Sequence, residues 1–214
     1  MALVEVSWRP SATPPDEATA AFLRDAGKRI DAFFEARWQD PIVGFVPSDF
    51  TKVWPLLAAI AEQGLARGRR FCEWGSGFGV VAGLAARLGF AAHAIEIEKD
   101  LVEASRRLLA DHRLAVKLAC GSFIPEGGEP LAEIKAEMAW LLTGGPDGHA
   151  LLGVDADEWD VVFAYPWPGE EHVVERIFER FAADGALLVT HRADKGIRLQ
   201  RKVARRRSLD QPAC

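Results

Sequence analysis

A glycine-rich turn between a short apolar strand and an alanine-rich helix constrains this chain more than any other feature. The stretch RRFCEWGSGFGVVAGLAARLG, residues 69–89, predicts a strand that ends on Glu73, then a turn, then a helix. The turn carries Gly75, Gly77 and Gly79, with Ser76 between the first two. Glycine lets a backbone approach a ligand where a Cβ atom would collide, and the following helix points its free N–H groups at the same place. The sequence therefore predicts a binding site for a nucleotide-like ligand.

Strands and helices alternate along the chain after this turn. The pattern predicts strands over 91–97, 115–121 and 186–191 and one that ends at Ala164, with helices over 99–112 and 171–185. Such alternation indicates right-handed βαβ units, and hence an α/β fold with a mostly parallel sheet and helices on both faces. A further helix is expected over 130–142, and residues 197–203 are a candidate last strand that runs antiparallel.

The residues before the glycine turn predict a helical extension. Proline-spotted residues 1–15 predict irregular backbone, and an amphipathic helix is expected from Asp16 to about Trp38. Ser48 is placed to cap a second helix that runs from Asp49 to about Gly64. We therefore divide the chain into an extension or lid (1–65), a ligand-binding core (66–207) and a tail (208–214).

Composition indicates a soluble globular protein with one main domain. The 214 residues are 49% hydrophobic and 27% charged, which is enough to bury a full core. No apolar run approaches the ~20 residues needed to cross a bilayer, and the N-terminus lacks the pattern of a secretion signal, so no membrane contact and a cytoplasmic location are expected. The three scattered cysteines form neither a disulfide framework nor a metal motif, and no metal site is predicted. The oligomeric state is left open.

Charge is distributed unevenly along the chain. The formal net charge is −5, yet residues 192–207 hold eight Lys and Arg residues against one Asp. An acidic body argues against a protein that wraps nucleic acid, although the basic segment offers local contacts to phosphate. The simpler interpretation of this segment is a solvated or disordered end, and it is the one we expect.

The residues around the glycine turn separate two classes of ligand. A dinucleotide site requires a third glycine three positions after the second, where this chain has Val80. Glu73 instead precedes the turn in the pattern ExGxGxG, which resembles the class I S-adenosylmethionine-dependent methyltransferases. That resemblance implies a Rossmann-like, doubly wound fold with S-adenosylmethionine as cofactor. The cofactor carries an ammonium and a sulfonium but no phosphate, so a carboxylate beside the turn favours it.

The resemblance implies further cofactor-binding residues at the ends of the next strands. Glu96 is expected to accept hydrogen bonds from the ribose hydroxyls, and Ile97 to pack on the adenine. Gly121 and Ser122 are expected near the adenine amino group, with Ser122 in place of the commoner Asp. The expected cofactor-binding residues are Glu73, Gly75, Ser76, Gly77, Gly79, Glu96, Ile97, Gly121, Ser122 and Ala164.

The turn AYPWP, residues 164–168, ends the predicted fourth strand and should face the transferable methyl group. Amino-group methyltransferases often carry an Asn/Asp-Pro-Pro-Tyr/Phe turn here. The present turn is similar in Pro166 and Trp167, but it has Ala164 and Tyr165 in the first two positions. Tyr165 and Trp167 are the predicted catalytic residues, because aromatic rings desolvate an amine and tolerate its positive charge. The histidines at 172 and 191 are weaker candidates for a base.

A second, weaker resemblance concerns the acceptor. FVPSD, the GSG form of the turn and GFAAHAIEIEKDLVEASRR are similar to lysine methyltransferases related to the mitochondrial ATP-synthase c-subunit enzyme and, more remotely, to Dot1 enzymes. This implies that Pro47 and Ser48 lie near the methionine end of the cofactor. It also favours a protein amine or a small molecule over RNA as acceptor. An RNA methyltransferase that uses the basic C-terminal segment, a non-catalytic partner-binding module and an NAD oxidoreductase remain as alternatives.

Overall fold

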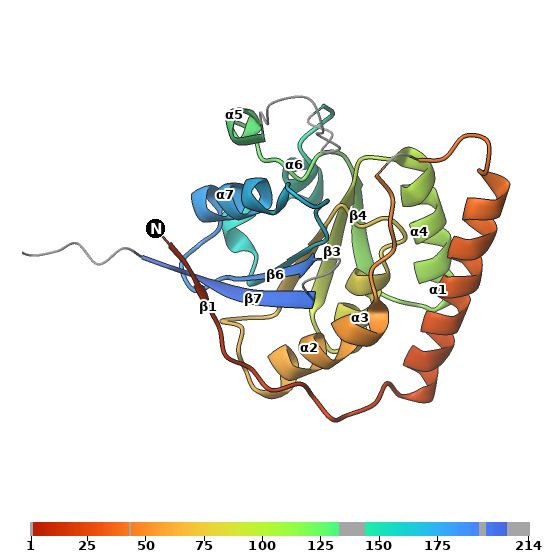
Figure 1. Ribbon diagram of the computed structural model, residues 1–214, viewed down its shortest axis with the longest axis horizontal. Coiled ribbons are helices and arrows are strands. Elements are labelled where there is room, and N and C mark those ends of the chain that lie inside the picture. Colours follow the sequence, from red (N-terminus) through yellow and green to blue (C-terminus); the bar gives the residue numbers. More distant parts are fainter. Residues whose placement is uncertain (1, 43, 133–143, 193–195, 205–214) are drawn as a thin grey trace, which may run out of the picture.

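The computed structural model describes residues 2–42, 44–132, 144–192 and 196–204. Within these ranges a seven-stranded sheet, with strand order β1-β7-β6-β5-β2-β3-β4, lies between layers of helices (Figure 1). The strands are β1 (Ala2–Glu5), β2 (Arg70–Trp74), β3 (Ala91–Glu96), β4 (Val116–Cys120), β5 (Val161–Ala164), β6 (Leu187–Arg192) and β7 (Gly196–Val203). The helices are α1 (Glu17–Ala36), α2 (Phe50–Glu62), α3 (Val80–Arg87), α4 (Lys99–Asp111), α5 (Glu129–Ala132), α6 (Gly148–Leu152), η1 (Ala156–Glu158) and α7 (Glu171–Phe181).

The sheet is mostly parallel, which confirms the predicted doubly wound α/β fold. Strands β2 to β6 pair in parallel, whereas β7 runs antiparallel to β6, as the sequence predicts. Strand order reverses at β2, which pairs with β3 on one side and with β5 on the other. In sheets of this kind the crevice at the reversal, outside the carboxyl ends of the strands, is where ligands bind.

Two apolar cores cover the two faces of the sheet. One core packs α1, α2, α3 and α4 against the first face, and Figure 1 shows α1 as the outermost of these helices, beside α4. The other core packs α7 against the second face, with Trp159 fully buried within it. The predicted helical layers on both faces are therefore confirmed, and α1 and α2 share a core with the glycine-turn helix α3.

The N-terminal residues differ from the prediction of irregular backbone. Ala2–Glu5 form the edge strand β1, which pairs antiparallel with β7 in the register Ala2↔Val203. A strand of four residues is too short for a periodic pattern to mark it, and its partner lies about two hundred residues away in the chain. Part of the predicted extension thus belongs to the core sheet. The division at residue 65 stays a prediction.

Over residues 196–204, the basic C-terminal segment is not the solvated end that the sequence suggests, and residues 205–207 lie outside the described part of the chain. Residues 196–203 form β7, and Lys202 is 2% exposed, with its ammonium donating to the Ala182 carbonyl. Arg198 pairs with Glu5 and with Glu175. The basic side chains of this strand therefore hold β1, β7 and α7 together.

Helix boundaries follow local capping chemistry. The carboxylate of Asp16 accepts a hydrogen bond from the Thr19 N–H at 2.7 Å and so begins α1, as expected. At α2 the cap is Asp49, which accepts from the Thr51 N–H at 3.1 Å, and not the predicted Ser48. Serine and aspartate both cap helices, so the sequence alone did not decide which of the two neighbouring residues begins α2. Most of the helix predicted over 130–142 lies outside the described residues, and the short elements α6 and η1 were not predicted.

No helix in the described part of the chain is both long and apolar enough to cross a membrane.

Candidate functional site

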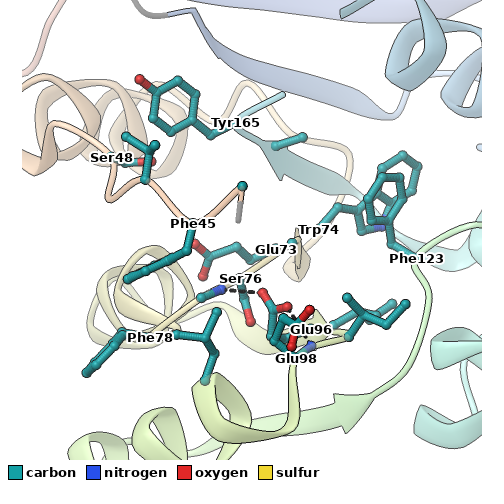
Figure 2. Close-up of a pocket in the computed structure, with 18 of the residues that line it drawn as sticks. Phe45, Ser48, Glu73, Trp74, Ser76, Phe78, Glu96, Glu98, Phe123 and Tyr165 are labelled. Atoms are coloured by element: carbon teal, nitrogen blue, oxygen red, sulfur yellow. Dashed lines mark hydrogen bonds between the residues drawn. The ribbon is translucent and has the colours of Figure 1, made fainter. Parts of the chain in front are cut away.

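A pocket lies outside the carboxyl ends of β2, β3 and β5, at the point where strand order reverses. The space within it and at its open mouth amounts to about 1110 Å³, solvent at the mouth included. Its walls come from the glycine turn, residues 44–48, the turn after β5 and the start of α7. Figure 2 shows Phe45, Ser76 and Tyr165 among the side chains that line it. All predicted site residues except Gly79 line this pocket. Their individual roles stay predictions.

The three glycines of the turn serve different purposes. Gly75, Gly77 and Gly79 all have positive φ, at 68°, 53° and 66°, which disfavours other residues. A Cβ atom at Gly77 would lie 2.5 Å from the ring of Phe45, and one at Gly79 would collide with the Ser105 hydroxyl. A Cβ atom at Gly75 would meet nothing within 4 Å, so this glycine borders open space in which a ligand can approach the backbone. Gly79 instead lets α3 pack against α4.

Glu96 holds the glycine turn in place. Its carboxylate accepts hydrogen bonds from the Gly77 N–H at 2.7 Å and from the Glu98 N–H at 2.9 Å, and Figure 2 shows it pointing towards the turn. The side chain is 6% exposed, and burial raises its pKa above the usual value, although these N–H groups oppose the shift. Glu96 therefore organises the turn in addition to any contact with a ligand.

Glu73 is a second buried carboxylate beside the turn. It is 5% exposed, and its Oε2 accepts a hydrogen bond from the Ala82 N–H at 2.8 Å. Burial raises the pKa of Glu73 to about 8, and the neighbouring Glu96 contributes in the same direction. A cation placed beside these two carboxylates would favour their charged forms.

Two buried polar atoms in the pocket wall have no hydrogen-bond partner in the structure. They are the Ser76 hydroxyl and the Trp74 Nε1, and both side chains line the pocket. Trp74 stacks on Phe123, with ring centroids 5.2 Å apart and planes 9° from parallel. Since buried polar groups are nearly always paired, these two donors mark positions where a ligand would supply polar atoms.

The segment 44–48 covers one side of the pocket. Phe45 stacks between Phe34 and Phe78, with centroid distances of 5.3 and 5.7 Å. The indole Nε1 of Trp167 donates to the carbonyl of Gly44 at 3.0 Å and so joins this segment to the turn after β5. Pro47 and Ser48 line the pocket as well. Trp54, by contrast, belongs to the core.

The turn after β5 forms the other end of the pocket. The rings of Tyr165 and His191 lie 4.3 Å apart, but His191 is 3% exposed and does not line the pocket. Burial lowers the pKa of His191, which keeps its ring neutral near pH 7. His172 is exposed on α7 and does not line the pocket either. Neither histidine is therefore placed to touch a ligand in this pocket.

Glu170 is a pocket residue that the sequence did not single out. It follows the turn after β5, is 4% exposed, and lines the pocket together with Tyr165 and Trp167. The available signal was a carboxylate directly after the Pro-Gly pair that ends the AYPWPG segment. Among the described residues, no group of three or more side chains is arranged to hold a metal ion.

Comparison with solved structures supports one fold. No family model and no curated protein matches the chain. An RNA methyltransferase from Salinibacter ruber in complex with S-adenosyl-L-homocysteine matches with a TM-score of 0.50 at 20% identity, over 78% of this chain and 100% of that one. The chain has the fold of class I methyltransferases. An O-methyltransferase from Bacillus cereus in complex with the same compound matches with a TM-score of 0.50 at 14% identity, over 84% of this chain and 67% of that one.

The methyltransferase fold does not identify the acceptor. The two similar structures carry names that refer to RNA and to oxygen methylation, and one fold can host both kinds of chemistry. The weaker resemblance to c-subunit and Dot1 lysine methyltransferases stays a prediction.

Proposed function

We propose that this protein is an S-adenosylmethionine-dependent methyltransferase that binds its cofactor in the pocket outside the carboxyl ends of β2, β3 and β5. The observation that carries the proposal is the carboxylate-rich wall around an ordered glycine turn. Among the described residues that line the pocket there are four glutamates and no Lys, Arg or His. A pyrophosphate would be repelled by this wall, whereas an ammonium and a sulfonium would be attracted.

The residues of the pocket fit the parts of the cofactor. Glu73 faces the pocket beside the open space at Gly75, so it suits the ammonium group. The unpartnered Ser76 hydroxyl suits the carboxylate of the methionine part as a hydrogen-bond donor. The apolar Ile97, with Gly121 and Ser122, suits the adenine ring. Each carboxylate oxygen of Glu96 already accepts one N–H and keeps a second lone pair for a ribose hydroxyl.

When bound, S-adenosylmethionine supplies a methyl group on a sulfonium, which needs no further activation. The protein therefore acts mainly by orientation and by exclusion of water. Phe45 and its neighbours in the segment 44–48 shield one side of the pocket, and the hydrogen bond from Trp167 to Gly44 holds this segment against the turn after β5. An acceptor reaches the methyl group from the side of Tyr165 and Trp167.

The RNA alternative loses most of its support in the described part of the chain. Its argument was the basic segment 192–207, but the side chains of β7 are engaged within the protein. Arg198 pairs with two glutamates, Arg201 donates to the carbonyls of Leu65 and Gly185, and Lys202 is buried. These cations are not presented to a phosphate backbone.

A binding titration tests the proposal directly. S-adenosylhomocysteine, S-adenosylmethionine and NADH are titrated into the protein by calorimetry, with Glu73→Gln as the site variant and the exposed Glu103→Gln as its control. We expect both sulfur compounds to bind and NADH not to bind, with binding weakened about tenfold or more in Glu73→Gln only. Binding of NADH in place of the sulfur compounds would overturn the proposal.

A further inference from the structure

We infer that His149 is a positioning residue for the adenine of the cofactor. It lies outside the pocket lining and holds the backbone of Phe123, so that the segment 121–123 at the end of β4 forms a fixed surface for the base. The inference rests on the proposed function and deepens it, because it adds a buried side chain to the residues that shape the site.

Hydrogen bonds fasten the end of β4 to the start of α6. The Ser122 N–H donates to the Pro146 carbonyl, and the Gly148 N–H donates to the Ser122 carbonyl, both at 2.8 Å. His149 adds a bond through its ring, whose Nε2 lies 2.8 Å from the carbonyl oxygen of Phe123. Ser122 and Phe123 line the pocket, so α6 holds this part of the wall from behind. The bond from His149 is a side-chain bond, which a substitution can remove.

The hydrogen bonds of His149 fix the proton on one ring nitrogen. The indole N–H of Trp159 is a donor only, and its nitrogen lies 3.0 Å from Nδ1, so Nδ1 accepts and carries no proton. The carbonyl of Phe123 is an acceptor only, so Nε2 carries the proton and donates it. Burial lowers the pKa of His149, although the bond to Phe123 opposes this shift, and the ring is neutral near pH 7. His149 therefore has one tautomer, in which its two nitrogens link Trp159 to Phe123.

Phe123 presents a supported aromatic ring at this end of the pocket. The ring stacks on Trp74, with centroids 5.2 Å apart, and the His149 ring meets Trp74 edge-on at 5.9 Å. The three rings behind Phe123, those of Trp74, His149 and Trp159, are at most 3% exposed. Figure 2 shows Trp74 and Phe123 together at the end of the pocket away from Tyr165. Buried rings therefore keep Phe123 in a fixed position beside the pocket.

The lining residues at this end suit a purine. Ile97 follows β3 and Phe123 follows β4, and these two strands are neighbours in the sheet, so a flat apolar base finds side chains of both to pack on. The Ser122 hydroxyl accepts the Ile124 N–H at 3.1 Å and keeps its own proton for a ring nitrogen of the base. One short segment thus carries both an aromatic ring and a donor. It binds the base tightly only if it is held in place before the ligand arrives.

The test compares two substitutions of His149 that keep different parts of the imidazole. Asparagine places an acceptor near the position of Nδ1 and so keeps the bond from Trp159, but it does not reach Phe123. Glutamine places an amide donor near the position of Nε2 and so keeps the bond to Phe123. By calorimetry we expect His149→Asn to bind S-adenosylhomocysteine about tenfold more weakly than the wild type, and His149→Gln to stay within about threefold of it. Equal affinities of the wild type and His149→Asn would overturn the inference.

A second ligand locates the loss at the base. Methylthioadenosine contains the adenine, the ribose and the sulfur but lacks the amino-acid part, so His149→Asn should weaken both ligands by the same factor. Glu73→Gln should weaken S-adenosylhomocysteine alone, because Glu73 suits the ammonium group. If His149→Asn weakens only S-adenosylhomocysteine, His149 does not act on the adenine end and the inference is wrong.

His93→Asn is the matched control for a merely structural effect. His93 is also buried, its ring lies 4.9 Å from that of Trp159, and its Nδ1 lies 3.0 Å from the Ala91 carbonyl oxygen. It lies in the first half of β3, away from the pocket at the end of this strand. His93→Asn should lower the free energy of unfolding but leave both affinities unchanged. An affinity loss equal to that of His149→Asn would reduce the role of His149 to stability and contradict the inference.

A double substitution tests whether His149 acts through Phe123. In a Phe123→Ala background the ring that His149 positions is gone, so the further change His149→Asn should weaken methylthioadenosine much less than it does in the wild type. An undiminished loss in that background would contradict the inference.

The wild type itself provides a measurement if the variants do not fold. In NMR spectra of protein labelled at the histidine ring nitrogens, His149 should be neutral at pH 7 with its proton on Nε2. Its signals should shift when methylthioadenosine binds, whereas those of His93 should not. A proton on Nδ1, or unchanged His149 signals with the ligand bound, would overturn the inference. A protein that binds neither methylthioadenosine nor S-adenosylhomocysteine would instead overturn the proposed function.

Discussion

Glu73 should make the free protein less stable as the pH rises, and Glu73→Gln should remove this effect. Burial raises the pKa of Glu73 from 4.5 to about 8. Between these two values the folded protein keeps a proton that the unfolded chain has released, so the free energy of unfolding falls with increasing pH. Above about pH 8 both states are ionised at this residue, and the loss stays constant. The carboxylate that suits the cofactor therefore destabilises the empty site.

The expected effect of Glu73→Gln follows from the two pKa values. The raised pKa lowers the free energy of unfolding of the wild type by about 3 kcal/mol at pH 7 and about 5 kcal/mol at pH 9. The variant should avoid this loss. Glutamine keeps a side-chain oxygen that can accept the Ala82 N–H, so the variant preserves the hydrogen bond of the carboxylate. For a chain of this size, about 3 kcal/mol raises Tm by roughly 6–12 °C at pH 7.

Urea unfolding of the cofactor-free protein at pH 5, 7 and 9 provides the measurement. The free energy of unfolding of Glu73→Gln should exceed that of the wild type slightly at pH 5 and by an increasing amount towards pH 9. The other titrating groups are the same in both proteins, so their contributions cancel in this comparison. Glu103→Gln, at an exposed position on α4, should change the free energy of unfolding by less than about 0.5 kcal/mol at every pH. A difference that does not depend on pH, or a glutamine variant less stable than the wild type at pH 9, would refute the reasoning.

Three further changes test other contacts. Gly77→Ala combines a φ of 53° with a Cβ atom 2.5 Å from an aromatic ring, so it should lower the free energy of unfolding by at least about 2 kcal/mol. Gly64→Ala, at φ 60° in open space, should lower it by only about 1 kcal/mol in the same urea experiment. Equal losses in the two variants would contradict the close approach of Phe45 to Gly77. Trp167→Phe removes the donor to the Gly44 carbonyl and should speed dissociation of S-adenosylhomocysteine several-fold in stopped-flow experiments; an unchanged rate would show that this bond does not retain the ligand. Deletion of residues 2–6 exposes the edge of β7 and should lower Tm and promote aggregation, measured by light scattering during heating; an unaltered melting curve would contradict a stabilising role for β1.

The sequence predicted the parts of the molecule that local patterns determine. The strand, glycine turn and helix over residues 69–89 are contiguous, so spacing alone was enough to place the turn beside the pocket. Glu96 was expected from the resemblance and from its place at the end of the next strand, and the structure brings it to the Gly77 N–H. The function of Glu96 in organising the turn was not foreseen, since no sequence pattern reports which way a carboxylate at a strand end points.

The parts that were missed depend on contacts distant in the chain or on turn geometry. The residues of β1 have no periodic pattern of their own, and they are extended because β7 offers them hydrogen bonds. Glu170 resembles any surface acid that precedes a helix, and only the path of the turn after β5 buries it. The basic residues of β7 look solvated in the sequence, because their acidic and carbonyl partners come from four separate segments.

The pairing of β1 with β7 has a consequence for folding during synthesis. The first described residues of the chain pair only with residues 200–203, so β1 has no partner in the sheet until the ribosome has made nearly all of the described chain. Synthesis proceeds at about 5–20 residues per second, so β1 waits on the order of ten seconds or more while the central strands can already assemble. Nascent chains that stop before β7 would expose both β1 and the edge of β6, which gives chaperones and proteases a means to tell incomplete chains from finished ones.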